Sequence, residues 1–149
     1  MHPLRQVVRR VLWASGMGAA ALLAAGCAPM SSPAPSGSNV ILNGNQEVPP
    51  VSTAATGSGT IKVLMDRSVY GSVMTSGVAG TAAHIHLAGP GQNGPVIIPL
   101  NRTADNTWSV PASIRLNETQ YEAFRLGNLY VNVHSAANSG GEIRGQLTP

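Results

Sequence analysis

Residues 129–134 read LYVNVH, and apolar and polar side chains alternate along this run. In a β-strand, successive side chains point to opposite faces, so Leu129, Val131 and Val133 share one face. The residues between them share the other face, which ends in His134. The apolar face predicts contact with a hydrophobic core, whereas the polar face predicts a surface or a functional site.

Other segments have the length and composition of short strands. Glycine, proline, asparagine and serine separate them, which is typical of turns. The predicted strands cover residues 40–42, 57–65, 68–75, 83–87, 96–100, 107–111, 129–134 and 142–147. Short strands with a turn about every ten residues indicate an all-β fold, an antiparallel β-sandwich or barrel.

One segment has a helical pattern instead. In LNETQYEAFRLG, residues 116–127, Asn117 is a good N-cap, and Gly127 stands where a helix commonly ends. Tyr121, Phe124 and Leu126 are expected on one apolar face. We therefore predict a single short crossover helix between two strands.

The N-terminal segment resembles an export signal. Three arginines precede an apolar run over residues 11–25, which is shorter than the ~20 residues of a membrane-spanning helix. Cys27 follows LLAAG, which resembles the lipobox of bacterial lipoproteins, although Ala24 replaces the usual leucine. We expect residues 1–27 to be a lipoprotein signal peptide, with lipid on Cys27 anchoring an exported protein in the periplasm or outer cell envelope. A free thiol in an ordinary signal peptide, and a twin-arginine signal, are the alternatives.

Residues 28–38 are rich in proline and serine and predict a flexible tether, which leaves 39–149 as one domain. Of the nine Lys and Arg residues, three lie in the signal, and all six Asp and Glu residues lie after it. The mature chain therefore has six charges of each sign and no net charge. This balance argues against nucleic acid as a partner, and nothing in the sequence indicates an oligomeric state.

His84 and His86 lie two residues apart in the predicted strand over residues 83–87, so they share a face. Their Cβ atoms would be ~6.5–7 Å apart, a span that two imidazoles can close onto one metal ion. His134 is the remaining histidine after the signal. The three histidines are thus candidate ligands of one metal ion, and the alternative is that they are solvated or hydrogen-bonded strand residues.

Three imidazoles without a thiolate leave a coordination position open for water or substrate. Copper has the highest affinity at a given nitrogen site, so we expect copper rather than zinc. Met65 and Met74 could add a soft ligand or, alternatively, fill gaps in the core.

Several polar residues could assist such a site. Arg144 lies ten residues after His134 and could attract an anion to the metal; alternatively, it pairs with Glu142 or holds loop carbonyls. Glu47 could be a ligand, an orienting carboxylate or a brace for its own loop. Asn132 and Glu142 are further candidates for residues that support the ligands.

The sequence resembles the CHRD domain, named from chordin. The resemblance rests on LNGNQEVPPVSTAATGSG, AAHIHLAGPGQNGPV and NLYVNVHSAANSGGEIRGQL, and covers about residues 40–147. In chordin the domain belongs to an extracellular antagonist of growth factors. The resemblance therefore implies a secreted domain more clearly than it implies a reaction.

A more distant resemblance is to copper–zinc superoxide dismutases. Their copper is held by an H-V-H strand pair and a later V-V-H histidine, with a C-terminal arginine nearby, and His84, His86, His134 and Arg144 fall in the same order. This resemblance implies a Greek-key β-sandwich, superoxide-dismutase-like or immunoglobulin-like, with superoxide as the anion. The loop after His86 lacks the zinc ligands and the cysteine pair is absent, so a copper-only site is implied.

These observations favour a copper-binding lipoprotein that dismutes superoxide. A copper carrier or buffer without turnover would need the same ligands. A metal-free interaction module at the cell surface would need none of them.

Overall fold

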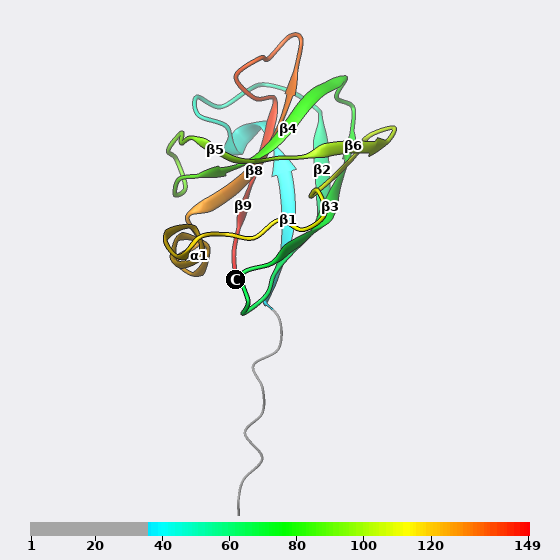
Figure 1. Ribbon diagram of the computed structural model, residues 1–149. Helices are drawn as coiled ribbons and strands as arrows, with labels where there is room; N and C mark the ends of the chain where they lie inside the picture. Colours follow the sequence, from blue (N-terminus) through cyan, green and yellow to red (C-terminus); the bar gives the residue numbers. More distant parts are fainter. Residues whose placement is uncertain (1–35) are drawn as a thin grey trace, which may run out of the picture. The chain divides into compact units, whose positions relative to one another are not determined.

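Antiparallel strands are the main secondary structure of residues 36–149, the part of the chain that the computed structural model describes (Figure 1). The strands in this part are β1 (Ser36–Asn43), β2 (Thr56–Val63), β3 (Val69–Ser76), β4 (Gly80–Leu87), β5 (Val96–Pro99), β6 (Asn101–Ala104), β7 (Thr107–Ser109), β8 (Leu129–Ser135) and β9 (Ile143–Leu147). A 3₁₀ turn, η1 (Gly44–Gln46), follows β1, and one α-helix, α1 (Glu118–Arg125), connects β7 to β8. The predicted all-β class with one short crossover helix is confirmed.

All the strands of residues 36–149 belong to one sheet, in the order β5-β4-β8-β9-β1-β2-β3-β7-β6. The two edge strands, β5 and β6, are consecutive in the chain and separated by Leu100 alone. Figure 1 shows this segment running across the other strands. The sheet therefore closes on itself like a flattened barrel or sandwich, and Trp108 of β7 packs against Gly80 of β4 across the interior.

The core lies inside this closed sheet. Leu129, Val131 and Val133 of β8 are at most 1% exposed, as the alternation in LYVNVH predicts. They pack with buried aliphatic residues of the other strands, among them Leu42, Ile61, Val63, Val73, Ile85, Ile143 and Leu147. Because the apolar side chains of β4, β8 and β9 point inwards, their alternating neighbours are free to form a polar layer on the outer face.

Helix α1 begins and ends as predicted. The Asn117 side chain caps it by accepting a hydrogen bond from the backbone N–H of Gln120, and Gly127 follows the helix with φ of 71°. Tyr121 and Phe124 pack against the core, but Leu126 is 73% exposed. Leu126 comes two residues after Phe124, about 200° around the helix, so it points away from the apolar face.

Strand β1 starts earlier than the predicted 40–42 segment. Residues 36–38, assigned above to the tether, pair with Ile61–Val63 of β2, and the Ser38 hydroxyl accepts a hydrogen bond from the backbone N–H of Thr148. Backbone pairing does not require apolar side chains, which is why composition misses this start. The predicted signal peptide, Cys27 and the rest of the tether lie outside the described residues.

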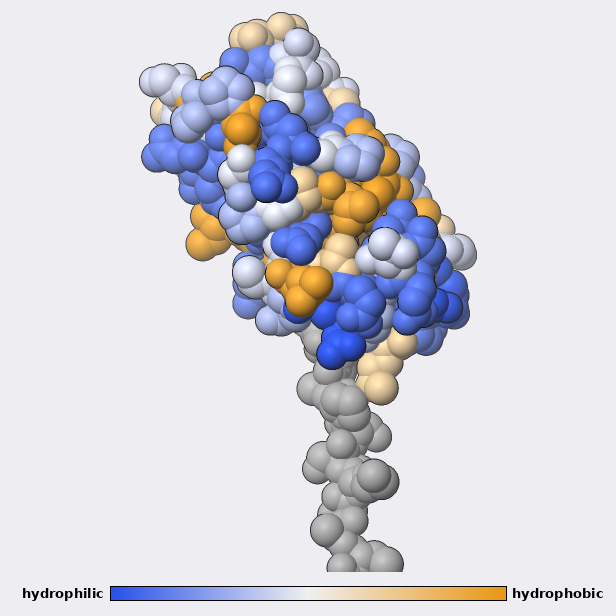
Figure 2. Space-filling model, turned by 90° about the vertical axis from the view of Figure 1, so that its left-hand side faces the viewer, coloured by the Kyte–Doolittle hydropathy of each residue, from blue (hydrophilic) through white to orange (hydrophobic). Residues whose placement is uncertain are grey.

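The described surface on the side that bears α1 and β5 is mixed in hydropathy. Figure 2 shows this face, where hydrophobic residues form separate patches among hydrophilic ones. Leu126 and Val96 are among the exposed apolar residues. Within residues 36–149, no helix has the length and hydrophobicity needed to cross a membrane.

Candidate metal site

The three histidines lie on two paired strands, β4 and β8. His84 is opposite Asn132 in the register, His86 is opposite Tyr130, and His134 is opposite Ala82. Strand parity therefore places all three imidazoles on the outer face of the sheet, away from the buried Val131 and Val133. The predicted convergence of residues 50 positions apart in the sequence is confirmed.

The ligand nitrogens of the three side chains lie within 4.8 Å of one another. His84 Nδ1 and His134 Nε2 are 3.0 Å apart. His86 is 8% exposed, whereas His84 and His134 are half-buried. The cluster is thus held at the surface of the sheet, with one buried and two accessible imidazoles.

Backbone carbonyls orient two of the rings. His86 Nδ1 lies 2.9 Å from the carbonyl oxygen of Gly94, and His134 Nδ1 lies 2.9 Å from that of Ser139. A carbonyl only accepts, so in each case Nδ1 carries the proton and Nε2 keeps its lone pair. Carbonyl partners of this kind are typical of histidines that bind metals, because they fix the tautomer and the ring orientation.

The residues fit a metal ion. Bonds of ~2.0–2.1 Å allow two ligand nitrogens on one ion to be at most ~4.2 Å apart, so the widest separation would have to close by roughly 0.6 Å. His86 Nε2 is buried and has no hydrogen-bond partner among the described residues. A buried nitrogen left without a partner is costly, and a metal ion would satisfy it. His84 offers Nδ1 to an ion once its proton is on Nε2.

The electrostatic surroundings favour the neutral forms of His84 and His86. Burial lowers the pKa of His84, and the neighbouring His134 and His86 lower it further. Burial likewise lowers the pKa of His86, against the hydrogen bond to Gly94, which raises it. Only a neutral imidazole can bind a metal, so the lowered pKa values keep His84 and His86 available as ligands.

Arg144, the residue predicted to attract an anion, is only 1% exposed. Its guanidinium donates hydrogen bonds to the carbonyls of Gln92 and Gly89, at 2.8 and 3.1 Å, and to the Gln146 side chain at 3.2 Å. These contacts match the alternative in which Arg144 holds the carbonyls of a loop. Anion guidance by Arg144 stays a prediction.

Glu47 and Asn132 meet at Gly141. A Cβ atom on Gly141 would lie 2.5 Å from Glu47 Oε1 and 2.8 Å from Asn132 Nδ2, so only glycine fits there. Glu47 Oε1 and Asn132 Oδ1 are buried without a hydrogen-bond partner among residues 36–149. Burial raises the pKa of Glu47 to about 7, although the nearby Arg144 lowers it.

Glu142 and the two methionines lie elsewhere. Glu142 accepts a hydrogen bond from the Thr53 hydroxyl at 2.9 Å and is not part of the histidine cluster. Met65 and Met74 are each 64% exposed, so neither fills a gap in the core. Met74 lies on β3, and four strands lie between β3 and β4 in the sheet: β8, β9, β1 and β2.

Residues 38–147 match the family model of the CHRD domain. The chain belongs to the CHRD-domain family. The matched region includes every strand of the described sheet except the first two residues of β1. No curated protein and no solved structure matches this CHRD-domain chain.

Sequence reasoning missed three participants in the site of this CHRD domain. Gly94 and Ser139 act through backbone carbonyls, which no side-chain pattern reveals. Tyr130 stacks on His86, with ring centroids 4.7 Å apart and planes inclined by 6°. Its place on the polar face of LYVNVH was the available signal, because Tyr130 and His134 share that face.

Proposed function

We propose that the protein binds a single copper ion through His84, His86 and His134. The observation that carries the proposal is the convergence of three imidazoles, two of which donate Nδ1–H to a backbone carbonyl and therefore keep their lone pair on Nε2. The site offers nitrogen and no thiolate, and at a given nitrogen site copper binds more tightly than the other first-row divalent metals. The loop over residues 88–95 contains no histidine or acid that could hold a second ion.

Copper titration of the purified protein tests this proposal. We expect wild type to bind one equivalent, and His84→Ala and His134→Ala each to weaken binding by at least ~100-fold, since each removes a direct ligand. Met74→Ala is the matched control, because it removes an exposed soft side chain outside the cluster. Equal affinity in wild type and the histidine variants would leave the metal-free interaction module as the better account.

Superoxide dismutation is the reaction we propose for the copper-loaded protein. Copper would supply one-electron redox chemistry, and the half-buried His84 and His134 leave the cluster open to a small anion. Arg144 and Glu47 line a surface cavity of about 390 Å³, and none of the three histidines lines it. The positive charge of Arg144 at this cavity supports attraction of superoxide.

A copper carrier without turnover is the competing function, and a specific observation favours it. The Arg144 guanidinium already donates to loop carbonyls and is almost fully buried, so little of it faces an incoming anion. A superoxide assay on copper-loaded wild type and Arg144→Lys separates the two functions. Wild-type activity no higher than that of aquated copper would leave the copper carrier as the better account of the function.

We also propose that the protein is exported and anchored by lipid on Cys27. The basic and apolar segments before Cys27 support this. In bacterial cells, we expect wild type in the detergent-extracted membrane fraction and Cys27→Ser in the soluble exported fraction. Equal distribution of the two would remove the anchor from the proposal.

A further inference from the structure

We infer that Tyr130 is a positioning residue for the metal site, which holds the His86 imidazole in its ligand orientation and links it to Arg144. This inference rests on the proposed metal-binding function. Tyr130 itself offers no nitrogen to an ion. It acts through the ring that it stacks on and through the loop that it contacts.

The first step is the stack itself. Tyr130 lies between His86 and Arg144 on three adjacent strands, β4, β8 and β9. Its ring is nearly parallel to the His86 imidazole, and the Arg144 guanidinium carbon lies 3.4 Å from its centroid. Tyr130 is 2% exposed, so these contacts exclude water. A cation held against an aromatic face in a desolvated place is a strong contact.

The second step is a pair of hydrogen bonds at Gly94. Its carbonyl accepts from His86 Nδ1 at 2.9 Å, and its N–H donates to the Tyr130 hydroxyl at 3.3 Å. Gly94 is itself confined, because a Cβ there would lie 1.9 Å from the carbonyl oxygen of Leu87. Tyr130 thus supports His86 twice, through its ring and through the residue that fixes the His86 tautomer.

The third step extends the unit to the loop over residues 88–95. Arg144 donates to the carbonyls of Gly89 and Gln92 in that loop, five and two residues before Gly94. The same guanidinium stacks on Tyr130. Arg144 therefore contacts both the Tyr130 ring and the loop that contains Gly94, the two groups that hold His86. This buried arginine thus has a positioning role that does not require contact with an anion.

Together these contacts aim His86 Nε2 at the cluster. That atom is buried without a hydrogen-bond partner among the described residues. The orientation comes from Gly94, whose carbonyl accepts from Nδ1, and from Tyr130, which stacks on the face of the ring. Loss of the Tyr130 ring would let the imidazole turn, and its affinity for a metal would fall.

The test compares Tyr130→Leu, which removes the ring, with Tyr130→Phe, which keeps it. Replacing a residue that orients a ligand typically costs 10–100-fold in metal affinity. We expect Tyr130→Leu to lose copper affinity by about this factor, and Tyr130→Phe to lose less than about 5-fold because its stack remains. Tyr121→Leu is the matched control, since Tyr121 packs on the core from α1, away from the histidines.

A second measurement needs no metal. Nitrogen NMR of the imidazoles in the copper-free protein, at about pH 8 where histidines are neutral, reports which His86 nitrogen carries the proton. We expect Nδ1–H in wild type and Tyr130→Phe, and a mixture of tautomers in Tyr130→Leu. This measurement separates the inference from the proposed function, because it decides the role of Tyr130 even if wild type binds no copper.

Circular dichroism shows whether each variant folds. If Tyr130→Leu does not fold, Tyr130→Met takes its place, since a flexible thioether fills more of the ring's volume without restoring a parallel stack. A folded ring-free variant with wild-type copper affinity and the wild-type Nδ1–H tautomer would overturn the inference. So would an equal loss in Tyr121→Leu.

Discussion

Glu47 shows how a single buried side chain makes the stability of this domain depend on pH. Its carboxyl group is 5% exposed, and burial raises its pKa from 4.5 to about 7 against the opposing effect of Arg144. Between these two values the folded state binds the proton more tightly than the unfolded state does. The contribution of this group to stability is therefore complete below about pH 4.5, and it is lost as the pH rises through about 7.

Replacing Glu47 by glutamine removes this titration while keeping the shape of the side chain. We expect the free energy of unfolding of Glu47→Gln, relative to that of wild type, to rise by about 1–3 kcal/mol from pH 5 to pH 8. Urea unfolding at both pH values measures the difference, and the histidines cancel because both proteins contain them. Glu122→Gln, at an exposed position, is the control. A difference that does not change with pH would contradict the assignment of the raised pKa to Glu47.

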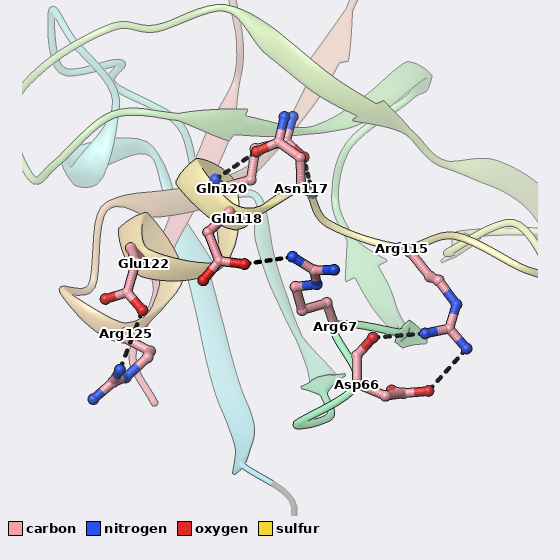
Figure 3. Close-up of polar contacts among 8 residues, drawn as sticks. All are labelled: Asp66, Arg67, Arg115, Asn117, Glu118, Gln120, Glu122 and Arg125. Atoms are coloured by element: carbon pink, nitrogen blue, oxygen red, sulfur yellow. Dashed lines mark hydrogen bonds and ion pairs between the residues drawn. The ribbon is translucent and has the colours of Figure 1, made fainter.

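At the scale of elements, α1 depends on side chains at its N-terminus. Asn117 and Gln120 form a reciprocal capping box, in which each side chain bonds the backbone N–H of the other residue. Figure 3 shows this box beside the ion pair between Glu118 and Arg67, which connects the first turn of the helix to the turn before β3. Both partners of that ion pair are exposed, so the cap contributes more than the charges do.

Asn117→Ala should therefore destabilise the domain. Removing an asparagine N-cap costs about 0.5–2 kcal/mol, because an N–H of the first turn loses its acceptor. Thermal or urea unfolding measures the cost, with Thr119→Ala as the control at an exposed position inside α1. Thr119→Ala should leave stability unchanged or slightly higher, since alanine favours helix. An equal loss in both variants would mean that the cap does not act as described.

The same elements show which features a sequence can predict. Asn117 and Gly127 predict the helix ends, and alternation predicts the face of His134, because both signals are local. The start of β1 at Ser36 and the division of the 96–100 segment at Leu100 depend on pairing with distant strands. The carbonyls of Gly94 and Ser139 at the histidines depend on loop conformation. Such features have no side-chain pattern of their own.

At the scale of the whole domain, core and site occupy opposite faces of the same strands. In β8, Val131 and Val133 point into the closed sheet, while Tyr130 and His134 face the polar layer outside. The sheet thus provides a rigid frame for the ligands. The ligands come from β4 and β8, and their supporting groups come from β8, β9 and two loops. Metal binding should therefore be linked to folding, because the unfolded chain does not bring these parts together.

This linkage predicts that copper raises the thermal unfolding midpoint of the whole domain. At a free concentration 100 times the dissociation constant, binding adds about 2.7 kcal/mol, which for a domain of this size corresponds to a shift of roughly 10 °C. Scanning calorimetry with and without copper measures it. The double variant of His84→Ala and His134→Ala should show no shift, whereas Met74→Ala should behave like wild type because that side chain is exposed outside the cluster. An equal shift in the double variant would place the ion elsewhere on the protein, since the remaining His86 cannot hold it alone with comparable affinity.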